Sequence, residues 1–255
     1  MNKLSITSVF NNKQPFIAYI TAGHISVEQT IESILSLERA GVDIIELGVP
    51  FSDPVADGPV IQQAMTRALK QQITFDDVIY IIEKVREHSA IPLVLFSYYN
   101  PILKHGEHFY QRSQQAGVDA ILVVDLPLEE MAEHIQLCQR YNLQIIPLIT
   151  NTMALSRVKE SAALDSPFLY YVSRKGVTGV QAQSTIVTTK AHLAKVKEVA
   201  QKPVAIGFGI GCKKTAKEAL AVADGFVVGS YIVNLIEQAL HPEQIETLVK
   251  NIDPR

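Results

Sequence analysis

Residues 39-RAGVDIIEL-47 and 115-QAGVDAILVV-124 share one arrangement, in which a glycine after a helical segment is followed at once by an apolar run. Glycine just past a helix end is typical of helix C-caps. An almost uninterrupted apolar run is typical of a parallel strand that is covered on both faces. The two junctions form a weak internal repeat, and they predict parallel strands packed between helices.

The same pattern extends along the whole chain. Short runs rich in β-branched and aromatic residues recur eight times, at residues 16–20, 43–47, 93–97, 119–124, 144–149, 168–172, 203–207 and 225–228. Segments with helical spacing lie between them, for example after Ser26 and after Thr74. Eight strands in 255 residues, without a linker-like stretch, predict an α/β protein with a single (β/α)8 TIM barrel domain over residues 1–255. A doubly wound sheet is the alternative.

Composition and charge exclude several classes of protein. The 23 Lys and Arg residues stand against 26 Asp and Glu residues, so the net charge of -3 has the wrong sign for binding a nucleic-acid backbone. No apolar stretch approaches the roughly 18 residues that a membrane-spanning helix needs. Cys138 and Cys212 are too few and too far apart for a disulfide framework. We therefore expect a cytoplasmic protein that binds neither nucleic acid nor a membrane.

Two carboxylates lie at positions where TIM barrels carry their catalytic residues. Glu46 lies inside the apolar run 43-DIIEL-47, where a charge is costly unless it is paired or used. The next loop, 50-PFSDPVADGP-59, carries Asp53 and Asp57 among three prolines. Catalytic groups in barrels lie at the C-terminal strand ends and in the loops that follow. We interpret Glu46 and Asp57 as a pair whose environments separate acid and base roles. A structural ion pair for Glu46 and a turn role for either aspartate are the alternatives.

Three glycine-bearing turns follow the sixth, seventh and eighth expected strands, at 173-SRKGVTG-179, 207-GFGIG-211 and 229-GS-230. Barrels of this class often bind phosphate with the loops after the last strands and the N-terminus of a short helix. Glycine lets backbone N–H groups approach phosphate oxygens, and Ser230 adds a hydroxyl donor. The candidate phosphate ligands are therefore Gly179, Gly209, Gly229 and Ser230. Ordinary turns and helix caps are the alternative for each glycine alone.

Two absences narrow the expected chemistry. No lysine lies inside any of the eight apolar runs, which disfavours a Schiff-base aldolase. The seven histidines do not place two imidazoles and a carboxylate at neighbouring strand ends, which disfavours a metal-dependent epimerase or aldolase. We therefore expect no metal and no cofactor in this chain.

A series of motifs, taken in order, identifies a family: 46-ELGVPFSDPVADGP-59, 99-YNP-101, 125-DLP-127, 173-SRKGVTG-179, 207-GFGI-210 and 229-GS-230. They resemble the alpha chain of tryptophan synthase from about Phe16 to Ser230. The resemblance implies a (β/α)8 barrel that cleaves indole-3-glycerol phosphate to indole and glyceraldehyde 3-phosphate. It also implies an α2β2-type complex, in which a beta chain carries pyridoxal phosphate and receives the indole.

The resemblance implies roles for particular side chains. By position, Glu46 is similar to the family's general acid/base, and Asp57 to the carboxylate that steadies the indole ring nitrogen. Apolar walls around the indole would come from side chains at or beside strand ends, namely Tyr19, Phe96, Leu122, Tyr170 and Phe208. A place in the barrel core is the alternative for these side chains.

The sequence departs from the family's usual pattern at a few positions. Tyr19 stands where phenylalanine is frequent, and His24 stands where aspartate is usual. Gly211 and Cys212 replace the usual serine after 207-GFGI-210, which removes a good helix N-cap. Two other functions stay open at this point. One is another sugar-phosphate barrel such as an epimerase or aldolase, and the other is a barrel that binds a phosphorylated ligand without catalysis.

Overall fold

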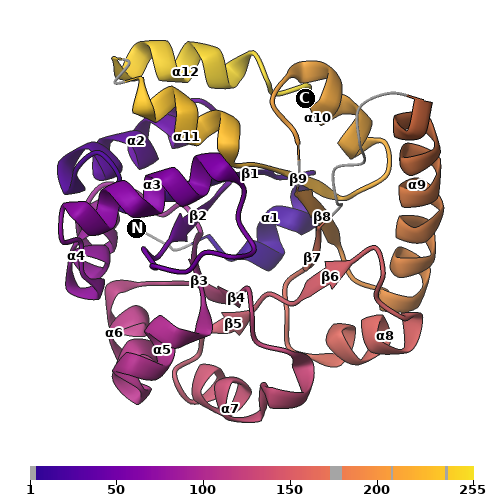
Figure 1. Ribbon diagram of the computed structural model, residues 1–255, viewed down its shortest axis with the longest axis horizontal. Coiled ribbons are helices and arrows are strands. Elements are labelled where there is room, and N and C mark those ends of the chain that lie inside the picture. The colour runs from indigo at the N-terminus through magenta and orange to yellow at the C-terminus, as the bar shows by residue number, and fades with distance from the viewer. Residues whose placement is uncertain (1–3, 173–179, 208, 239–240) are drawn as a thin grey trace.

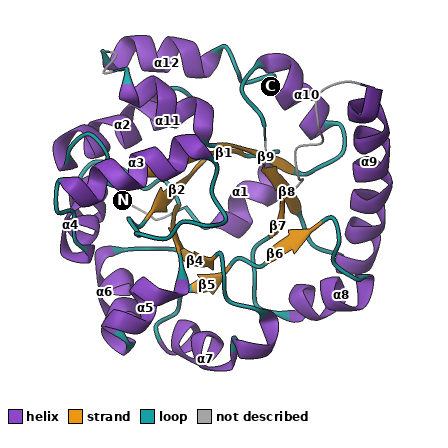
Figure 2. Ribbon diagram, in the orientation of Figure 1, coloured by secondary structure: helices purple, strands orange, loops and turns teal. Residues whose placement is uncertain are grey.

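The computed structural model describes residues 4–172, 180–207, 209–238 and 241–255. Within these ranges nine parallel strands form one curled sheet in the order β5-β4-β3-β2-β1-β9-β8-β7-β6 (Figure 1). The arrangement is TIM-barrel-like, with the strands in the middle and helices around them (Figure 2). The strands are β1 (Phe16–Thr21), β2 (Ile44–Gly48), β3 (Leu93–Ser97), β4 (Ala120–Val123), β5 (Gln144–Ile145), β6 (Leu148–Thr150), β7 (Leu169–Val172), β8 (Val204–Gly207) and β9 (Gly225–Val228).

Most of the helices in the described ranges connect consecutive strands. They are α1 (Ile6–Asn12), α2 (Val27–Arg39), α3 (Pro59–Lys70), α4 (Phe75–Arg86), α5 (Tyr99–His105), α6 (Glu107–Ala116), α7 (Ala132–Arg140), α8 (Leu155–Ala163), α9 (Val180–Ala200), α10 (Lys213–Leu220), α11 (Ser230–Glu237) and α12 (Pro242–Lys250), with a short 3-10 helix at Leu128–Glu130. No helix in the part of the chain that is described has the length and apolarity to cross a membrane.

Each of the eight apolar runs forms strand, but the fifth run forms two short strands. β5 pairs with β4, β6 pairs with β7, and Ile146 and Pro147 separate the two. The Ile146 N–H donates to the Ile121 carbonyl at 3.1 Å, and the Tyr170 N–H donates to the Pro147 carbonyl at 3.0 Å. The linking residues thus bond to the neighbours on both sides. Proline has no N–H to donate, which explains why the ladder is interrupted there.

The alternation of side chains along the strands divides the core into two layers. On β1, Ile17 and Tyr19 belong to an inner cluster enclosed by the sheet, whereas Ala18 and Ile20 pack outward against the helices. Successive strand residues point to opposite faces, so residues two apart share a face. On β2, Ile44 belongs to the inner cluster, and Glu46 therefore faces the inside of the sheet as well.

Helix α1 closes one end of the curled sheet, and the sequence analysis did not anticipate it. Ile6 and Val9 belong to the inner cluster, and the ring of Phe10 stacks on that of Phe168 with centroids 4.8 Å apart. Phe168 directly precedes β7, so α1 covers the end at which the strands begin. Figure 2 shows α1 in the middle of the ring of helices. The site must therefore lie at the opposite end.

Local capping agrees with the expected helix boundaries. Gly41 and Gly117 follow α2 and α6 with φ values of 99° and 95°, in the left-handed region that favours glycine. The N-terminus of α10 is capped in a way that the sequence analysis did not foresee. The Thr215 hydroxyl accepts hydrogen bonds from the Gly211 and Cys212 N–H groups, both at 3.3 Å, at the point where the chain enters the helix.

Candidate active site

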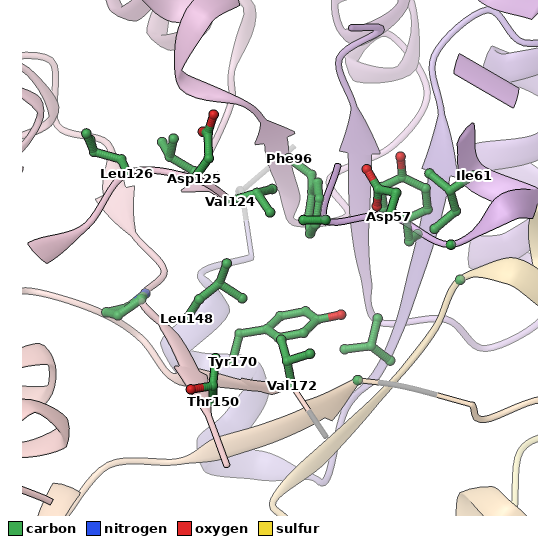
Figure 3. A pocket seen from close by; sticks show the side chains of 18 of the residues that line it. Asp57, Ile61, Phe96, Val124, Asp125, Leu126, Leu148, Thr150, Tyr170 and Val172 are labelled. Carbon is green, nitrogen blue, oxygen red and sulfur yellow. The ribbon is translucent and has the colours of Figure 1, made fainter. Parts of the chain in front are cut away.

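A cavity of about 920 Å³ lies at the end of the sheet where the strands finish. The candidate site residues that line it are Tyr19, Asp57, Phe96, Tyr170, Gly209, Gly229 and Ser230. They come from segments far apart in the sequence. Figure 3 shows Phe96 and Tyr170 on facing walls, with Asp57 beside Ile61 at one side. Gly179 and Phe208 lie outside the described residues.

Glu46 is a buried carboxyl group without a hydrogen-bond partner in the part of the chain that the structure describes. Its side chain is 0% exposed, and neither carboxyl oxygen has a partner among the described residues. Burial in this apolar interior disfavours the charged form and raises the pKa of Glu46 to about 8. Within the described ranges, Glu46 therefore does not form the structural ion pair that was the alternative to a catalytic role. Glu46 is not among the residues that line the cavity, and at neutral pH it is mostly protonated.

Asp57 has a different environment. It follows β2 in the loop before α3, and the Tyr98 hydroxyl donates a 2.8 Å hydrogen bond to its Oδ2 atom. Tyr98 is itself held by the Ala56 N–H, which donates to the Tyr98 oxygen at 3.0 Å. Burial raises the pKa of Asp57, and the bond from Tyr98 opposes this rise. The two carboxyl groups thus differ in hydrogen bonding: Asp57 accepts a bond from Tyr98, and Glu46 has no partner in the described ranges.

Aromatic rings form the inner wall of the cavity. The ring of Tyr19 meets the ring of Phe96 edge-on, with centroids 5.1 Å apart. The phenol of Tyr19 lies against Gly48, and the phenol of Tyr170 lies against Gly207, where any Cβ atom would overlap the hydroxyl. Glycine at the ends of β2 and β8 is therefore required for both phenols to lean over the neighbouring strand. Such rings suit a flat aromatic ligand.

Another part of the cavity lining, next to Tyr19, presents backbone groups. Gly209 has a φ of 69°, and Gly229 directly precedes α11, whose first residue is Ser230. Gly229 has no side chain that could cap the helix, so it cannot accept hydrogen bonds from the first N–H groups of α11 as a serine or aspartate would. All three residues line the cavity. This arrangement can bind an anion through backbone N–H groups and a hydroxyl.

Leu122 is part of the inner cluster, is 0% exposed, and does not line the cavity. Tyr98 and a further set of lining residues were not predicted from the sequence. These residues, on several sides of the cavity, are Ile61, Val124, Leu126, Leu148, Thr150 and Val172 (Figure 3). Tyr98 directly precedes the motif 99-YNP-101, but no pattern in the sequence indicates that it reaches Asp57, which is 41 positions away.

Comparisons with known proteins identify the family. The family model for the tryptophan synthase alpha chain matches residues 7–253. The chain belongs to this family. The tryptophan synthase alpha chain of Coxiella burnetii is 43% identical over 249 residues, which cover 98% of this chain and 97% of that protein.

Solved structures agree with the sequence comparison. The tryptophan synthase alpha subunit of Legionella pneumophila is 32% identical, with a TM-score of 0.87 and coverage of 98% of this chain and 97% of that one. A chain from the tryptophan synthase a2b2 complex of Pyrococcus furiosus is 33% identical, with a TM-score of 0.86 and coverage of 93% and 97%.

Family membership establishes the reaction. The chain is a carbon-carbon lyase that cleaves indole-3-glycerol phosphate to indole and glyceraldehyde 3-phosphate. Tryptophan synthase alpha chains need no cofactor of their own, because pyridoxal phosphate belongs to the beta subunit. The alternatives of another sugar-phosphate enzyme and of a noncatalytic barrel are thereby removed. Within the described residues, no three His, Cys, Asp or Glu side chains are grouped so that they could hold a metal ion.

The raised pKa of Glu46 predicts how stability depends on pH. Its ordinary value of 4.5 applies to the unfolded chain, and about 8 applies to the folded one. The folded state binds this proton more tightly than the unfolded state, and this stabilises the fold. The stabilisation is complete below pH 4.5 and is lost as the pH rises through 8. Glu46→Gln removes this titration. We expect the variant to gain up to about 1.4 kcal/mol of unfolding free energy per pH unit over the parent between those pH values. Urea unfolding of both proteins across this range measures the difference, and parallel curves would contradict an elevated pKa.

Proposed function

We propose that Glu46 is the group that gives a proton to the substrate and takes one back. The observation that carries this proposal is the buried carboxyl of Glu46, which has no hydrogen-bond partner in the described ranges, is mostly protonated at neutral pH and is the strand neighbour of Tyr19 in the cavity wall. Cleavage of the carbon-carbon bond needs a proton on indole C3 and a base for the hydroxyl that becomes the aldehyde. One carboxyl group with a pKa near the working pH can serve both steps in turn.

Glu46 ends the proposed reaction in the protonation state in which it began. Glu46 first donates its proton to indole C3 and becomes a carboxylate. The bond between C3 and the glycerol phosphate side chain then breaks as the side-chain hydroxyl loses its proton to Glu46. The electron pair of the broken bond returns to the indole ring, so indole and the aldehyde leave and Glu46 is again protonated.

We propose that Asp57 stabilises the positive charge that this protonation creates. When indole C3 receives a proton, positive charge develops at the ring N–H. An ionised carboxylate that faces the N–H stabilises that charge, and it does so most strongly where water is scarce. The bond from Tyr98 to Oδ2 supports this role, because it favours the ionised form of Asp57 and fixes its position. Tyr98 is therefore a positioning residue for Asp57.

We assign the walls and floor of the indole site to aromatic and aliphatic side chains, namely Tyr19, Phe96, Leu122, Tyr170 and Phe208. Tyr19, Phe96 and Tyr170 line the cavity, and Leu122 packs beneath it in the inner cluster. A flat apolar site of this kind holds the indole ring over Glu46 and excludes water, which strengthens the electrostatic interactions of both carboxyl groups.

We place the phosphate of the substrate at the turns after the last strands of a single (β/α)8 barrel that spans residues 1–255. In this proposal β5 and β6 are two halves of the fifth strand, and the phosphate contacts Gly179, Gly209, Gly229, Ser230 and the N-terminus of α11. The uncapped first turn of α11 and the left-handed φ of Gly209 support this placement.

A charge at Ser230 tests the phosphate site. We expect Ser230→Glu to weaken binding of both the substrate and glycerol phosphate by about a hundredfold or more, because a like charge would face the phosphate. Ser230→Gln is the matched control, since it has nearly the same size without the charge. Titration of each variant with glycerol phosphate measures the effect. Equal weakening by Glu and Gln would point to bulk alone, and normal binding by both would place the phosphate elsewhere.

We propose that a tryptophan synthase beta chain is the partner, in an α2β2-type complex. Related chains from Pyrococcus furiosus were solved as part of tryptophan synthase complexes. The loop at residues 50–59 supports the proposal, because Val55 is 82% exposed in the same loop that carries Asp57. A beta chain that covers Val55 would also restrain Asp57. Size-exclusion chromatography of the two purified chains together tests the association.

A further inference from the structure

The hydroxyl of Tyr19 is a polar group that the proposed chemistry does not yet use. Tyr19 on β1 and Glu46 on β2 are partners in the register of the parallel strands. Both side chains face the inside of the sheet, but Tyr19 lines the cavity whereas Glu46 does not. Tyr19 is therefore the cavity-lining neighbour of Glu46 on the adjacent strand.

The phenol of Tyr19 reaches over the strand that carries Glu46. Its hydroxyl lies against Gly48, at the point where a Cβ atom would stand. Gly48 is two positions after Glu46, so the two residues share the inner face of β2. The edge-on contact with Phe96 supports the ring from the next strand but one. The hydroxyl is thus held on the cavity side of the Glu46 carboxyl group.

The hydroxyl is held only weakly by its neighbour. The Tyr19 and Thr21 hydroxyl oxygens are 3.3 Å apart, whereas about 2.7 to 2.8 Å is typical of O–H···O hydrogen bonds. Thr21 is fully buried. Both oxygens of Glu46 lack a donor within the described ranges. A weakly bonded donor thus lies near an acceptor that becomes charged during the reaction.

We propose that the Tyr19 hydroxyl acts as a hydrogen-bond switch, which faces Thr21 while Glu46 is protonated and donates to the Glu46 carboxylate once the proton has moved to the substrate. Tyr19 is then a positioning residue that stabilises the transient carboxylate. The inference rests on the role proposed above for Glu46. Tyr19 forms and breaks no covalent bond, because its proton only changes the oxygen to which it is hydrogen-bonded.

The surroundings of Tyr19 keep its own proton in place. The titratable groups of the described chain that act on it are Asp57 in the β2–α3 loop, Tyr98 after β3 and Glu46 on β2, and Tyr170 on β7 is coupled to it in the same way. Burial and the neighbouring carboxyl charges raise the pKa of Tyr19 well above its ordinary value. The phenol therefore remains a donor at every pH at which Glu46 changes its charge.

Two isosteric substitutions separate this switch from a purely structural role. Tyr19→Phe removes the donor, so we expect it to raise the pKa of Glu46 further, by about one unit. Thr21→Val removes the competing partner and leaves the hydroxyl free to turn to Glu46, so we expect the pKa to fall instead. The double variant has no donor and should behave like Tyr19→Phe.

The measurement is a ¹³C NMR titration of glutamate-labelled enzyme, in which the Glu46 carboxyl signal is assigned by its loss in Glu46→Gln. Shifts of the Glu46 pKa in opposite directions for the two single variants support the switch. Shifts in the same direction, or no shift, overturn it. This titration does not depend on turnover, so it remains informative even if Glu46→Gln retains activity and the proposed role of Glu46 fails.

Steady-state kinetics give the second readout. We expect Tyr19→Phe to lower kcat about tenfold to a hundredfold, the range for a lost hydrogen bond to a charged group. The KM should change little, because phenylalanine keeps the ring and its contact with Phe96. An unchanged kcat overturns the proposal, and so does an effect confined to KM, since either result would leave the hydroxyl without a part in the reaction.

Discussion

Glu46→Gln is expected to lower kcat for indole release by about 10² to 10⁴, the range in which general acid/base groups contribute. Glutamine keeps the shape of the side chain but cannot give up and regain a proton. The fold and the binding of glycerol phosphate should persist, because Glu46 is hydrogen-bonded to nothing in the described ranges and its removal leaves no partner unsatisfied.

The controls for this prediction separate chemistry from binding and folding. Circular dichroism checks the fold, and glycerol phosphate titration checks the phosphate side of the cavity. The parent enzyme should lose activity at high pH as Glu46 ionises near pH 8, since the proton for indole C3 is then absent. Near-normal turnover by a folded Glu46→Gln protein would refute the role assigned to Glu46.

Asp57→Asn should have the second large effect, on the chemical step. Asparagine retains an oxygen that can accept the indole N–H hydrogen bond, but it lacks the charge that opposes the developing positive ring. Loss of such electrostatic stabilisation costs about 10² to 10³ in kcat in comparable sites. Single-turnover measurements of indole formation separate this step from product release.

Asp53→Asn is the matched control, because Asp53 lies in the same loop, is exposed, and accepts a 2.7 Å hydrogen bond from Ser52 without lining the cavity. In the isolated chain we expect Asp53→Asn to keep kcat close to that of the parent. If Asp57→Asn changed only KM, Asp57 would hold the substrate without stabilising the transition state. Equal losses in both variants would indicate a disturbed loop instead of a lost charge.

Much of the fold follows from patterns that are local in the sequence. The eight apolar runs became strands because β-branched and aromatic residues suit a sheet covered on both faces. Gly41 and Gly117 marked helix ends because only glycine readily adopts the required φ. Glu46 was found in the same way, since a charge inside an apolar run stands out without any knowledge of the neighbouring strands.

Other features depended on residues that are distant in the sequence. The sequence alone determined the parallel strands and their helices, the motifs of the family, and Glu46 and Asp57 as candidates. The tertiary structure decided that Glu46 has no partner among the described residues, that Tyr98 donates to Asp57, and that α1 covers the end of the sheet where the strands begin. Burial and hydrogen bonding depend on what surrounds a side chain in space, and the pKa of a carboxyl group follows from them. Only packing could show that Glu46 is protonated at neutral pH.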